Sequence, residues 1–439
     1  MSNIMNRIAK LLVVASFAGV ASSVSAEVWS LDSCVSYAIE NNINIRQQDI
    51  RVREGELAIT EAKDRFLPSA DASASQSFNF GRGLTAENTY ANRNTSNTQW
   101  GISVSLPLFQ GMTEYHRLEI AKMSLQQYVF ERESTKDNLT LNIISQYLQV
   151  LYNKEVAKSA RSKAELSDFE VERQKALIEA GKVAEATLYD FQAVAAQDRL
   201  QVVTSDNDVQ TALVNLANLL QLQSVEGFDI APINDMEPLI PTPDAVYSSA
   251  MGINNGILGL RQAVKVADRN ITLAKSGYIP TLSFNGGIGS SYYTVSGMPA
   301  ESFGAQMRHN FSTYIGFSLR IPLFDAFNTR NGINRAKLQK LSAELTLDQQ
   351  SADLYKEIQL AYYQALGARE RYTTSIQTLE NTRLSFDSTR ERFNLGRATQ
   401  ADYEQAKNNL FKTELAHIQA HYEYILRTHI LQFYRTNRL

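Results

Sequence analysis

The sequence predicts a mainly α-helical protein in which each chain adds four strands to a membrane β-barrel shared between copies. Three observations lead to this fold class. The chain repeats itself once, it contains very long runs without glycine or proline, and it holds four segments in which apolar and polar residues alternate. Together they predict duplicated coiled-coil hairpins that form an α-barrel, continuous with a barrel of strands.

The first 26 residues are expected to be a secretory signal peptide. Arg7 and Lys10 form a basic start, and an apolar run of about eleven residues, 11–21, follows them. Small residues at 24–26 complete the cleavage pattern. The apolar run is shorter than the roughly 20 residues that a membrane-spanning helix requires. We therefore expect cleavage after residue 26, with a retained N-terminal anchor as the alternative.

The remainder of the chain reads as a tandem duplication. Residues 106–109 (LPLF) recur as 321–324 (IPLF), 215 residues later, and residues 66–68 (FLP) recur as 278–280 (YIP). A segment with four prolines lies between the two units, and prolines at this density exclude a helix and favour an extended connector. The expected units are a first repeat, a proline-rich connector and a second repeat, at 27–226, 227–243 and 244–439.

Long helices are predicted in both repeats. Residues 112–180 contain neither glycine nor proline, and a helix of this length would extend on the order of 100 Å. The matching run 333–395 contains only Gly367. A helix of about 34 residues is expected before the strands of each repeat, at 31–64 and 244–276. The long runs are expected to end at four glycines: Gly111, Gly181, Gly332 and Gly396.

Apolar residues along the long helices follow the three-and-four spacing of coiled coils. Leu139, Ile143 and Tyr147 are one such stretch, and Leu379 and Phe386 belong to another. Helices that are joined by a short glycine turn and carry matching apolar seams pack as antiparallel hairpins. An ordinary helical bundle is the alternative that the helices alone leave open.

The four segments in which apolar and polar residues alternate are predicted to be strands with one face away from water and one face in contact with water. One face is apolar, as in Trp100, Ile102 and Val104, and the other is rich in serine, asparagine, threonine and glycine. Each segment holds about 10–12 alternating residues, the length that a tilted strand needs to cross the hydrocarbon layer. The predicted strands are 66–80, 98–109, 281–292 and 311–322.

Four strands cannot close a barrel, because the smallest barrels have about eight. Open strand edges are not tolerated in lipid, so the barrel must be shared. Two copies would give eight strands around a filled interior, whereas three give twelve strands around a lumen. The polar inner faces therefore favour a homotrimer with a 12-stranded barrel. A small sheet packed on the helices of a soluble protein is the alternative.

Composition and motifs argue against several classes of protein. The formal net charge of −3 disfavours a nucleic-acid partner, because nucleic-acid binders carry a basic surplus. The single cysteine, Cys34, cannot form an intrachain disulfide, and Asp32 before it argues against a lipid anchor. His417 and His421 have the spacing of two metal ligands, but two ligands seldom suffice. Nucleotide-binding and metalloprotease motifs are missing from the sequence, so no catalytic residue, metal or cofactor is expected.

The sequence resembles the TolC family of outer membrane efflux proteins over essentially the whole mature chain. The segments that carry the resemblance, in chain order, are 29–31 (WSL), Ala38, 41–42 (NN), 66–68, 106–109, 180–183 (AGKV), 321–324 and 395–398 (LGRA). The resemblance implies a homotrimer whose strands contact outer-membrane lipid and whose helices form a periplasmic tunnel. It also implies two partners, a periplasmic adaptor (membrane fusion) protein and an inner-membrane RND or ABC transporter.

In this family the two glycine turns form the periplasmic tip, where adaptor hairpins dock and the tunnel narrows. The resemblance therefore implies adaptor docking at six residues: Gly181, Lys182, Val183, Gly396, Arg397 and Ala398. It also implies a pore constriction beside the turns, formed by five residues: Phe393, Asp402, Gln405, Thr187 and Asp190.

Asp402 occupies the position of an acidic ring in the family. In a trimer, three such carboxylates would surround a narrow axis, attract cations and raise one another's pKa. The alternative is a solvated acid in the first turn of a helix, where it complements the helix dipole. The family's prototype has a second acid where this chain has Gln405, a hydroxyl-bearing aromatic at Phe393 and a basic residue at Ala398. The polar contacts that close the prototype are therefore largely absent.

These observations predict a passive exit duct in the outer membrane that belongs to a tripartite efflux or type I secretion system. An inner-membrane pump would energise transport through the periplasmic adaptor. The alternative function is a soluble periplasmic coiled-coil adaptor or scaffold. An enzyme is not expected, because no residue pattern supports one.

Overall fold

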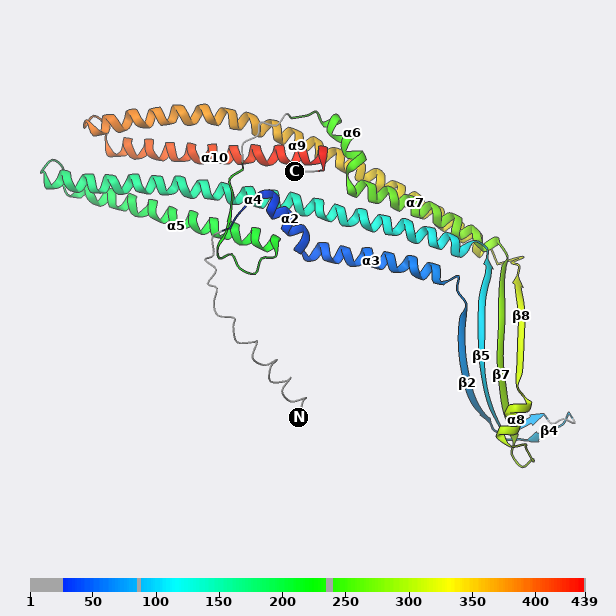
Figure 1. Ribbon diagram of the computed structural model, residues 1–439. Helices are drawn as coiled ribbons and strands as arrows, with labels where there is room; N and C mark the ends of the chain where they lie inside the picture. The colour runs from blue at the N-terminus through cyan, green and yellow to red at the C-terminus, as the bar shows by residue number, and fades with distance from the viewer. Residues whose placement is uncertain (1–26, 85–87, 234–239, 438–439) are drawn as a thin grey trace, which may run out of the picture.

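The computed structural model describes residues 27–84, 88–233 and 240–437, so the expected signal peptide lies outside the described residues. The chain is elongated, with a sheet of strands at one end and the turns of two helical hairpins at the other (Figure 1). The predicted fold class is confirmed, because duplicated long hairpins continue into a sheet of four long strands.

Both halves of the chain contain the same series of elements: two consecutive helices, two long strands and a hairpin of two long helices. In the first half these are α2 (Leu31–Asn41), α3 (Ile43–Asp64), β2 (Ser69–Asn79), β5 (Thr95–Gln110), α4 (Thr113–Glu179) and α5 (Ala186–Leu220). In the second half they are α6 (Pro243–Ile253), α7 (Asn255–Lys275), β7 (Thr281–Val295), β8 (Ser312–Arg320), α9 (Asn328–Asn394) and α10 (Gln400–Thr436). The short elements are β1 (Glu27–Trp29), β3 (Arg82–Leu84), β4 (Tyr90–Asn92), β6 (Phe228–Ile230), η1 (Ser276–Tyr278) and α8 (Phe303–His309).

The prediction of single helices at 31–64 and 244–276 was wrong, because each is broken by an asparagine. Asn42 separates α2 from α3, and Asn254 separates α6 from α7. Both residues are extended, with ψ of 129° and 115°. Each side-chain oxygen accepts a hydrogen bond from an N–H in the first turn of the next helix, at 2.9 Å for Asn42 and 3.0 Å for Asn254. Asparagine is a strong N-cap, so it favours a new helix start over a continuous helix.

The other predicted boundaries differ by a few residues. Gly332 was expected to precede the second long helix, but α9 begins at Asn328 and contains it. β5 and β7 extend beyond the predicted segments, whereas β2 and β8 are shorter than predicted. β2 starts directly after Pro68, and β8 ends two residues before Pro322. Proline has no N–H to donate to a neighbouring strand, so it limits β2 at its start and β8 at its end.

The four long strands form one antiparallel sheet in the order β2-β5-β7-β8. The register aligns Ala72 with Ile102 and Ile102 with Ile288, so apolar side chains share one face. This face is open to the surroundings, since Ile315 and Phe317 of β8 are 78% and 72% exposed. β2 and β8 form the edges, and neither pairs on its outer side with another strand of the described chain.

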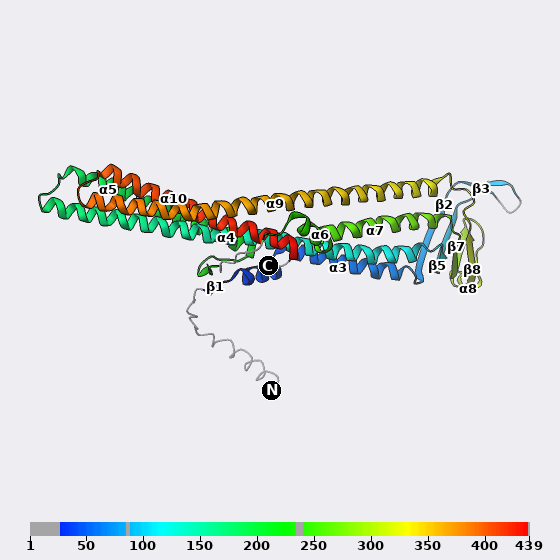
Figure 2. The same ribbon diagram turned by 90° about the horizontal axis from the view of Figure 1, so that it is seen from above.

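The helices follow the order of the strands. α3 precedes β2, α4 follows β5, α7 precedes β7 and α9 follows β8, and the contacts between helices run in the same order, α3 to α4 to α7 to α9. The view in Figure 2 shows these helices side by side along the molecule. Further from the sheet, α5 packs against α4, and α10 packs against α9 and α4.

The chain turns from strand to helix in the same way in both halves. Met112 before α4 and Phe327 before α9 are left-handed, with φ of 65° and 63°. Each follows another residue of positive φ, Gly111 in the first half and Ala326 in the second. Left-handed backbone is uncommon outside glycine, so these corners are conformationally strained in both halves.

The largest apolar core lies where β1 and β6 pair in parallel against α4. Tyr147 of α4 is 1% exposed, and its hydroxyl lies 2.7 Å from the Ala231 carbonyl oxygen and 3.0 Å from that of Trp29. Cys34 is fully buried in the same core, and burial raises the pKa of its thiol to about 12. The thiol is therefore a core side chain.

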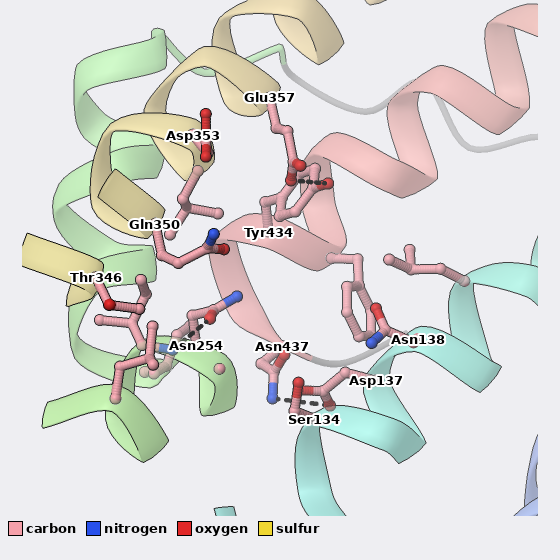
Figure 3. Close-up of a pocket in the computed structure, with 17 residues that line it drawn as sticks. Ser134, Asp137, Asn138, Asn254, Thr346, Gln350, Asp353, Glu357, Tyr434 and Asn437 are labelled. Carbon is pink, nitrogen blue, oxygen red and sulfur yellow. Dashed lines mark hydrogen bonds between the residues drawn. The ribbon is translucent and has the colours of Figure 1, made fainter. Parts of the chain in front are cut away.

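A pocket marks the place where the two halves meet, among α4, α6, α7, α9 and α10 (Figure 3). Asp137 of α4 points into it and accepts hydrogen bonds from the side-chain amides of Asn255, at 2.8 Å, and Asn437, at 3.3 Å. Burial raises the pKa of Asp137. These contacts connect the first half of the chain to the start of α7 and to the end of α10.

We expect Asn254→Ala to lower the free energy of unfolding by about 1 kcal/mol, because the first turn of α7 loses its side-chain cap. The comparison is made by chemical denaturation followed by circular dichroism. Asn254→Ser retains a capping oxygen and should stay close to the native value. Equal losses in both variants would show that the cap is not the stabilising feature.

Candidate functional site

The two hairpin turns lie at the end of the molecule opposite the sheet (Figure 1). α4 ends at Glu179, and the chain turns at Gly181. The Gly181 N–H donates to the Ile178 carbonyl at 2.8 Å, and the Lys182 N–H donates to the Leu177 carbonyl at 2.9 Å. This pair of hydrogen bonds defines a Schellman motif, which requires a left-handed residue after the helix. Gly181 supplies it, with φ of 68°.

The second turn repeats this geometry. The Gly396 N–H donates to the Phe393 carbonyl at 3.0 Å, and the Arg397 N–H donates to the Arg392 carbonyl at 2.7 Å. Gly396 has φ of 69°, and no atom lies within 4 Å of the place where a Cβ would be. Glycine is therefore favoured at both positions because the backbone is left-handed there, and not because another atom lies too close for a side chain. The side chains of Lys182, Val183 and Arg397 are exposed beside the turns, and Ala398 is half-buried.

The helices after the two turns begin differently. α10 begins with a capping box, in which Asp402 Oδ2 accepts from the Thr399 N–H at 2.9 Å and from the Thr399 hydroxyl at 2.7 Å. The Asp402 N–H in turn donates to the Thr399 hydroxyl oxygen at 3.2 Å. The N-cap of α5, Glu185, forms no such side-chain bond. Thr187 instead donates from its hydroxyl to the Ala184 carbonyl at 2.7 Å.

The capping box also affects the pKa of Asp402. Hydrogen bonds from the Thr399 side chain and backbone lower the pKa of the Asp402 carboxyl. Within one chain this is opposite to the rise that three carboxylates around an axis would cause. The helix-start role that was the alternative for Asp402 is therefore present in the structure.

The residues expected at the constriction fall into three places. Asp402 and Gln405 line an open polar groove between α9 and α10, together with Arg392 and Arg397. Thr187 and Asp190 belong to α5 on the other hairpin and lie outside that groove. Phe393 lies between the hairpins. A single chain thus brings Asp402 and Gln405 together but not the full predicted set.

Phe393 contributes to an aromatic contact between the two hairpins. Its ring stacks on Tyr403 of α10 with centroids 4.8 Å apart and lies 6.3 Å from the Phe191 ring of α5. The Arg173 guanidinium of α4 lies over the same ring, 5.4 Å from its centroid. Phe393 packs against a small apolar cluster formed by Val171, Leu188, Phe191 and Ala195.

A buried set of charged residues lies next to this aromatic contact. Lys407 of α10 is 2% exposed, and its Nζ lies 2.8 Å from Ser167 Oγ, 3.4 Å from Asp198 Oδ2 and 2.8 Å from Glu404 Oε2. Asp198 also pairs with Lys163 Nζ at 2.9 Å. We call these five residues the Lys407 network. It connects α4, α5 and α10, so it joins the hairpin of the first half to that of the second.

The Lys407 network is closely matched in charge. Burial raises the pKa of Asp198, but hydrogen bonds from Ser167 and Lys163 and the positive charges of Lys407 and Lys163 outweigh this effect, and the net shift is downward. Asp198 is therefore a buried carboxylate that stays ionised. Removing one partner of such a set leaves an uncompensated buried charge, which is strongly destabilising.

The model for the outer membrane efflux protein family matches the chain twice, over residues 34–221 and 246–432. The chain belongs to this family. The family resemblance stated from the sequence is thereby confirmed, and the family is one of outer membrane efflux proteins rather than of enzymes.

Individual relatives of the family are distant in sequence but cover the whole fold. The outer membrane protein TolC of Vibrio cholerae is 23% identical over 431 residues, which span 96% of this chain and 93% of the relative. The outer membrane efflux protein BepC of Brucella suis is 22% identical over 410 residues, which span 92% and 84%. The CmeC outer membrane channel of Campylobacter jejuni has a TM-score of 0.76 at 16% identity, over 92% of this chain and 85% of that channel.

Sequence reasoning missed the Lys407 network, although a signal was present. Phe191, Ala195 and Asp198 follow the apolar spacing of one helix face, as do Tyr403 and Lys407 of α10. A charge at a seam position is a candidate buried partner, because isolated charges are excluded from helix interfaces. The identity of the partners could not be read, because Ser167, Asp198 and Lys407 are remote from one another in sequence.

Two negative findings hold for the described residues. No helix there is long and apolar enough to span a membrane. No group of three or more metal-ligating side chains occurs there either. His417 and His421, considered as a metal pair, instead stack against Tyr372, and His417 Nδ1 lies 2.9 Å from Ser375 Oγ.

We expect Lys407→Ala to lower the free energy of unfolding by about 3 kcal/mol, because Asp198 and Glu404 lose a buried partner. Guanidinium denaturation of the detergent-solubilised protein measures this loss. Lys412→Ala removes an exposed lysine one turn further along α10 and should change the stability by no more than about 0.5 kcal/mol. A Lys407→Ala protein as stable as Lys412→Ala would contradict the role of the network.

The Asp198 carboxyl should also give the fold an acid-sensitive contribution. Its pKa is lower in the folded than in the unfolded protein, so the stabilisation is present above the ordinary carboxyl pKa of about 4 and is lost as the pH falls through the lower folded value. Asp198→Asn should therefore show a smaller loss of thermal stability between pH 5 and pH 3 than the native chain, with exposed Asp190→Asn as the control. If the thermal stabilities of the native and Asp198→Asn proteins fall in parallel over this pH range, Asp198 is not the source of the acid sensitivity.

Proposed function

We propose that three copies of this chain form an outer-membrane channel whose helices continue as a duct through the periplasm. Substrates would pass through the channel passively, and an inner-membrane pump would supply the energy for transport. The observation that carries this proposal is the sheet of four strands, apolar on one face, polar on the other and open at both edges. Its apolar side chains, Ile315 and Phe317 among them, are exposed in the single chain, as they would be against lipid.

The number of copies follows from the strands. Twelve strands enclose a lumen, whereas eight enclose a space that side chains fill. The inward face would carry Ser73, Ser103, Asn285 and Ser318, which suits a water-filled interior. Because the helices contact one another in the order of the strands, the same three-fold closure would arrange them into a ring.

The hairpin turns are the proposed docking site for a periplasmic adaptor, which would connect the channel to an RND or ABC transporter. The turns with Gly181 and Gly396 lie at the end farthest from the sheet. Beside them, the side chains of Lys182, Val183 and Arg397 are exposed and that of Ala398 is half-buried. Asp402, together with Gln405, Phe393, Thr187 and Asp190, would lie close to the narrow end of the duct.

The alternative, a soluble periplasmic adaptor or scaffold, is less well supported. A water-soluble protein would leave one face of the sheet in water, with Phe78, Ile315 and Phe317 each more than half exposed. A contiguous apolar face that is exposed in this way is typical of contact with a membrane or a partner. Family membership also supports the channel.

The test is conduction by the purified protein. In mild detergent the chain should sediment as a trimer, and after insertion into planar lipid bilayers it should conduct ions. A monomer that remains dissolved in buffer without detergent, or a trimer that never conducts, would contradict the proposal.

A second measurement addresses the Asp402 ring. Trivalent cations added on the tip side should block the native channel, and Asp402→Ala should weaken this block by about tenfold, equivalent to about 1.4 kcal/mol. Glu226→Ala removes an exposed acid beyond the end of α5 that lies away from the hairpin turn and serves as the matched control. Equal block of the native and Asp402→Ala channels would exclude a ring of Asp402 carboxylates at the constriction.

A further inference from the structure

The sheet carries one acidic and one basic side chain, at opposite edges. Throughout the four long strands, all of whose residues are described, Asp71 of β2 and Arg320 of β8 are the only charged residues. Both are exposed. They are separated by three strand spacings of about 4.8 Å each, so they cannot pair within one chain.

Both charges lie on the polar face. Asp71 aligns with Ser103 of β5, Ser103 with Gly287 of β7, and Gly287 with Tyr314 of β8. Tyr314 and Arg320 are six residues apart on a strand without a bulge, and side chains alternate between faces, so they point to the same side. The two edges therefore present opposite charges to the same side of the sheet.

The directions of the edge strands allow a head-to-tail junction between copies. Each neighbouring pair in β2-β5-β7-β8 is antiparallel, so β2 and β8 run in opposite directions. β8 of one copy can therefore pair antiparallel with β2 of the next, and a ring of such junctions covers every edge. Pairing of β8 with β8 would leave both β2 edges open, which lipid does not tolerate.

The lengths of the two strands restrict the register of this junction. β8 has 9 residues and β2 has 11. A nine-residue strand lies fully within an eleven-residue one in only three registers, which set Arg320 opposite Ser69, Ala70 or Asp71. The register with Ala70 would put apolar side chains of β8 beside polar side chains of β2 and is excluded.

In both remaining registers the charges meet. Arg320 is then either directly opposite Asp71 or one diagonal position away, and both placements are within reach of a long side chain. A junction without stagger, with Tyr314 opposite Asp71, would instead leave residues 317–320 of β8 without partners.

We propose that Arg320 of one copy forms an ion pair with Asp71 of the next at every subunit junction, on the inward face of the barrel. The proposal rests on the trimeric channel proposed above and adds the register and the orientation of its junctions. Because the pair faces a wet interior, its main effect is to specify which strands pair and in which register, more than to add stability.

Cysteine cross-linking tests the register directly. In a Cys34→Ala background, which removes the single native cysteine, Asp71→Cys and Arg320→Cys are combined, and the purified trimer is oxidised in detergent. A disulfide needs Cα atoms about 4.4–6.8 Å apart, and directly opposed residues of antiparallel strands are about 4.5–5.5 Å apart. We expect covalent dimers and trimers on a non-reducing denaturing gel from this pair or from Ser69→Cys with Arg320→Cys. Asp71→Cys with Tyr314→Cys is the matched control and should stay monomeric on the gel.

Charge exchange tests the ion pair independently of cysteine chemistry. Asp71→Arg and Arg320→Asp alone each place like charges at the junction, so the temperature at which the trimer dissociates should fall by at least about 2 °C. The double exchange, Asp71→Arg with Arg320→Asp, should recover most of this shift.

The outcomes separate this inference from the proposed function. A conducting trimer that cross-links through Asp71→Cys and Tyr314→Cys, or through neither Arg320→Cys pair, would overturn the junction and leave the channel intact. Recovery that fails in the double exchange would overturn the ion pair. A chain that never forms a trimer would remove the basis of both.

Discussion

A backbone N–H or C=O group that faces hydrocarbon without a partner is unfavourable by several kcal/mol. The sheet of this chain has two edges without a partner strand, along β2 and β8. Inside the sheet, β5 and β7 satisfy each other, and β2 and β8 are satisfied on one side only. This constraint connects the strands to the rest of the molecule. The helices α3, α4, α7 and α9 follow the order of the strands. A strand that pairs with β2 or β8 would therefore bring its own helix next to α3 or α9.

The two hairpins have the same turn but different helix starts. Gly181 and Gly396 adopt the same left-handed conformation and make the same pair of hydrogen bonds. Only the second turn is followed by a capping box, which engages the Asp402 carboxylate within its own chain. One polar contact that joins the hairpins lies further from the tip, in the Lys407 network, where the charges are buried and closely paired.

The architecture could be predicted from the sequence because the residue patterns that indicate it are long and occur in both repeats. The absence of glycine and proline from 112–180 predicts α4 almost to the residue, and the alternation around Ile102 predicts the face of β5. Local exceptions were harder to predict. Asn42 and Asn254 break helices through single capping bonds that a helical pattern does not reveal, whereas Gly332 weakens α9 by only about 1 kcal/mol and does not end it.

The candidate site was less predictable than the fold. Phe393 and Asp402 were assigned from their distance to Gly396, but side-chain partners depend on helices that meet only after folding. Phe393 turns toward Tyr403 and Phe191, and Asp402 turns back to Thr399. The partners of Lys407 come from α4 and α5 and have no sequence proximity to it.

The burial of the Lys407 network also bears on how the protein responds to salt. Mobile ions screen exposed charges over about 8–10 Å at moderate ionic strength, but they cannot enter a dry helix interface. Ion pairs between exposed side chains, such as Arg161 with Asp206 at 57% and 42% exposure, weaken as the salt concentration rises. The side chains of Lys407 and Asp198 are only 3% and 5% exposed, so their ion pair is shielded from the dissolved ions. The contact between the hairpins is thus insulated from the electrolyte around it, while the outer surfaces of the same helices remain sensitive to it.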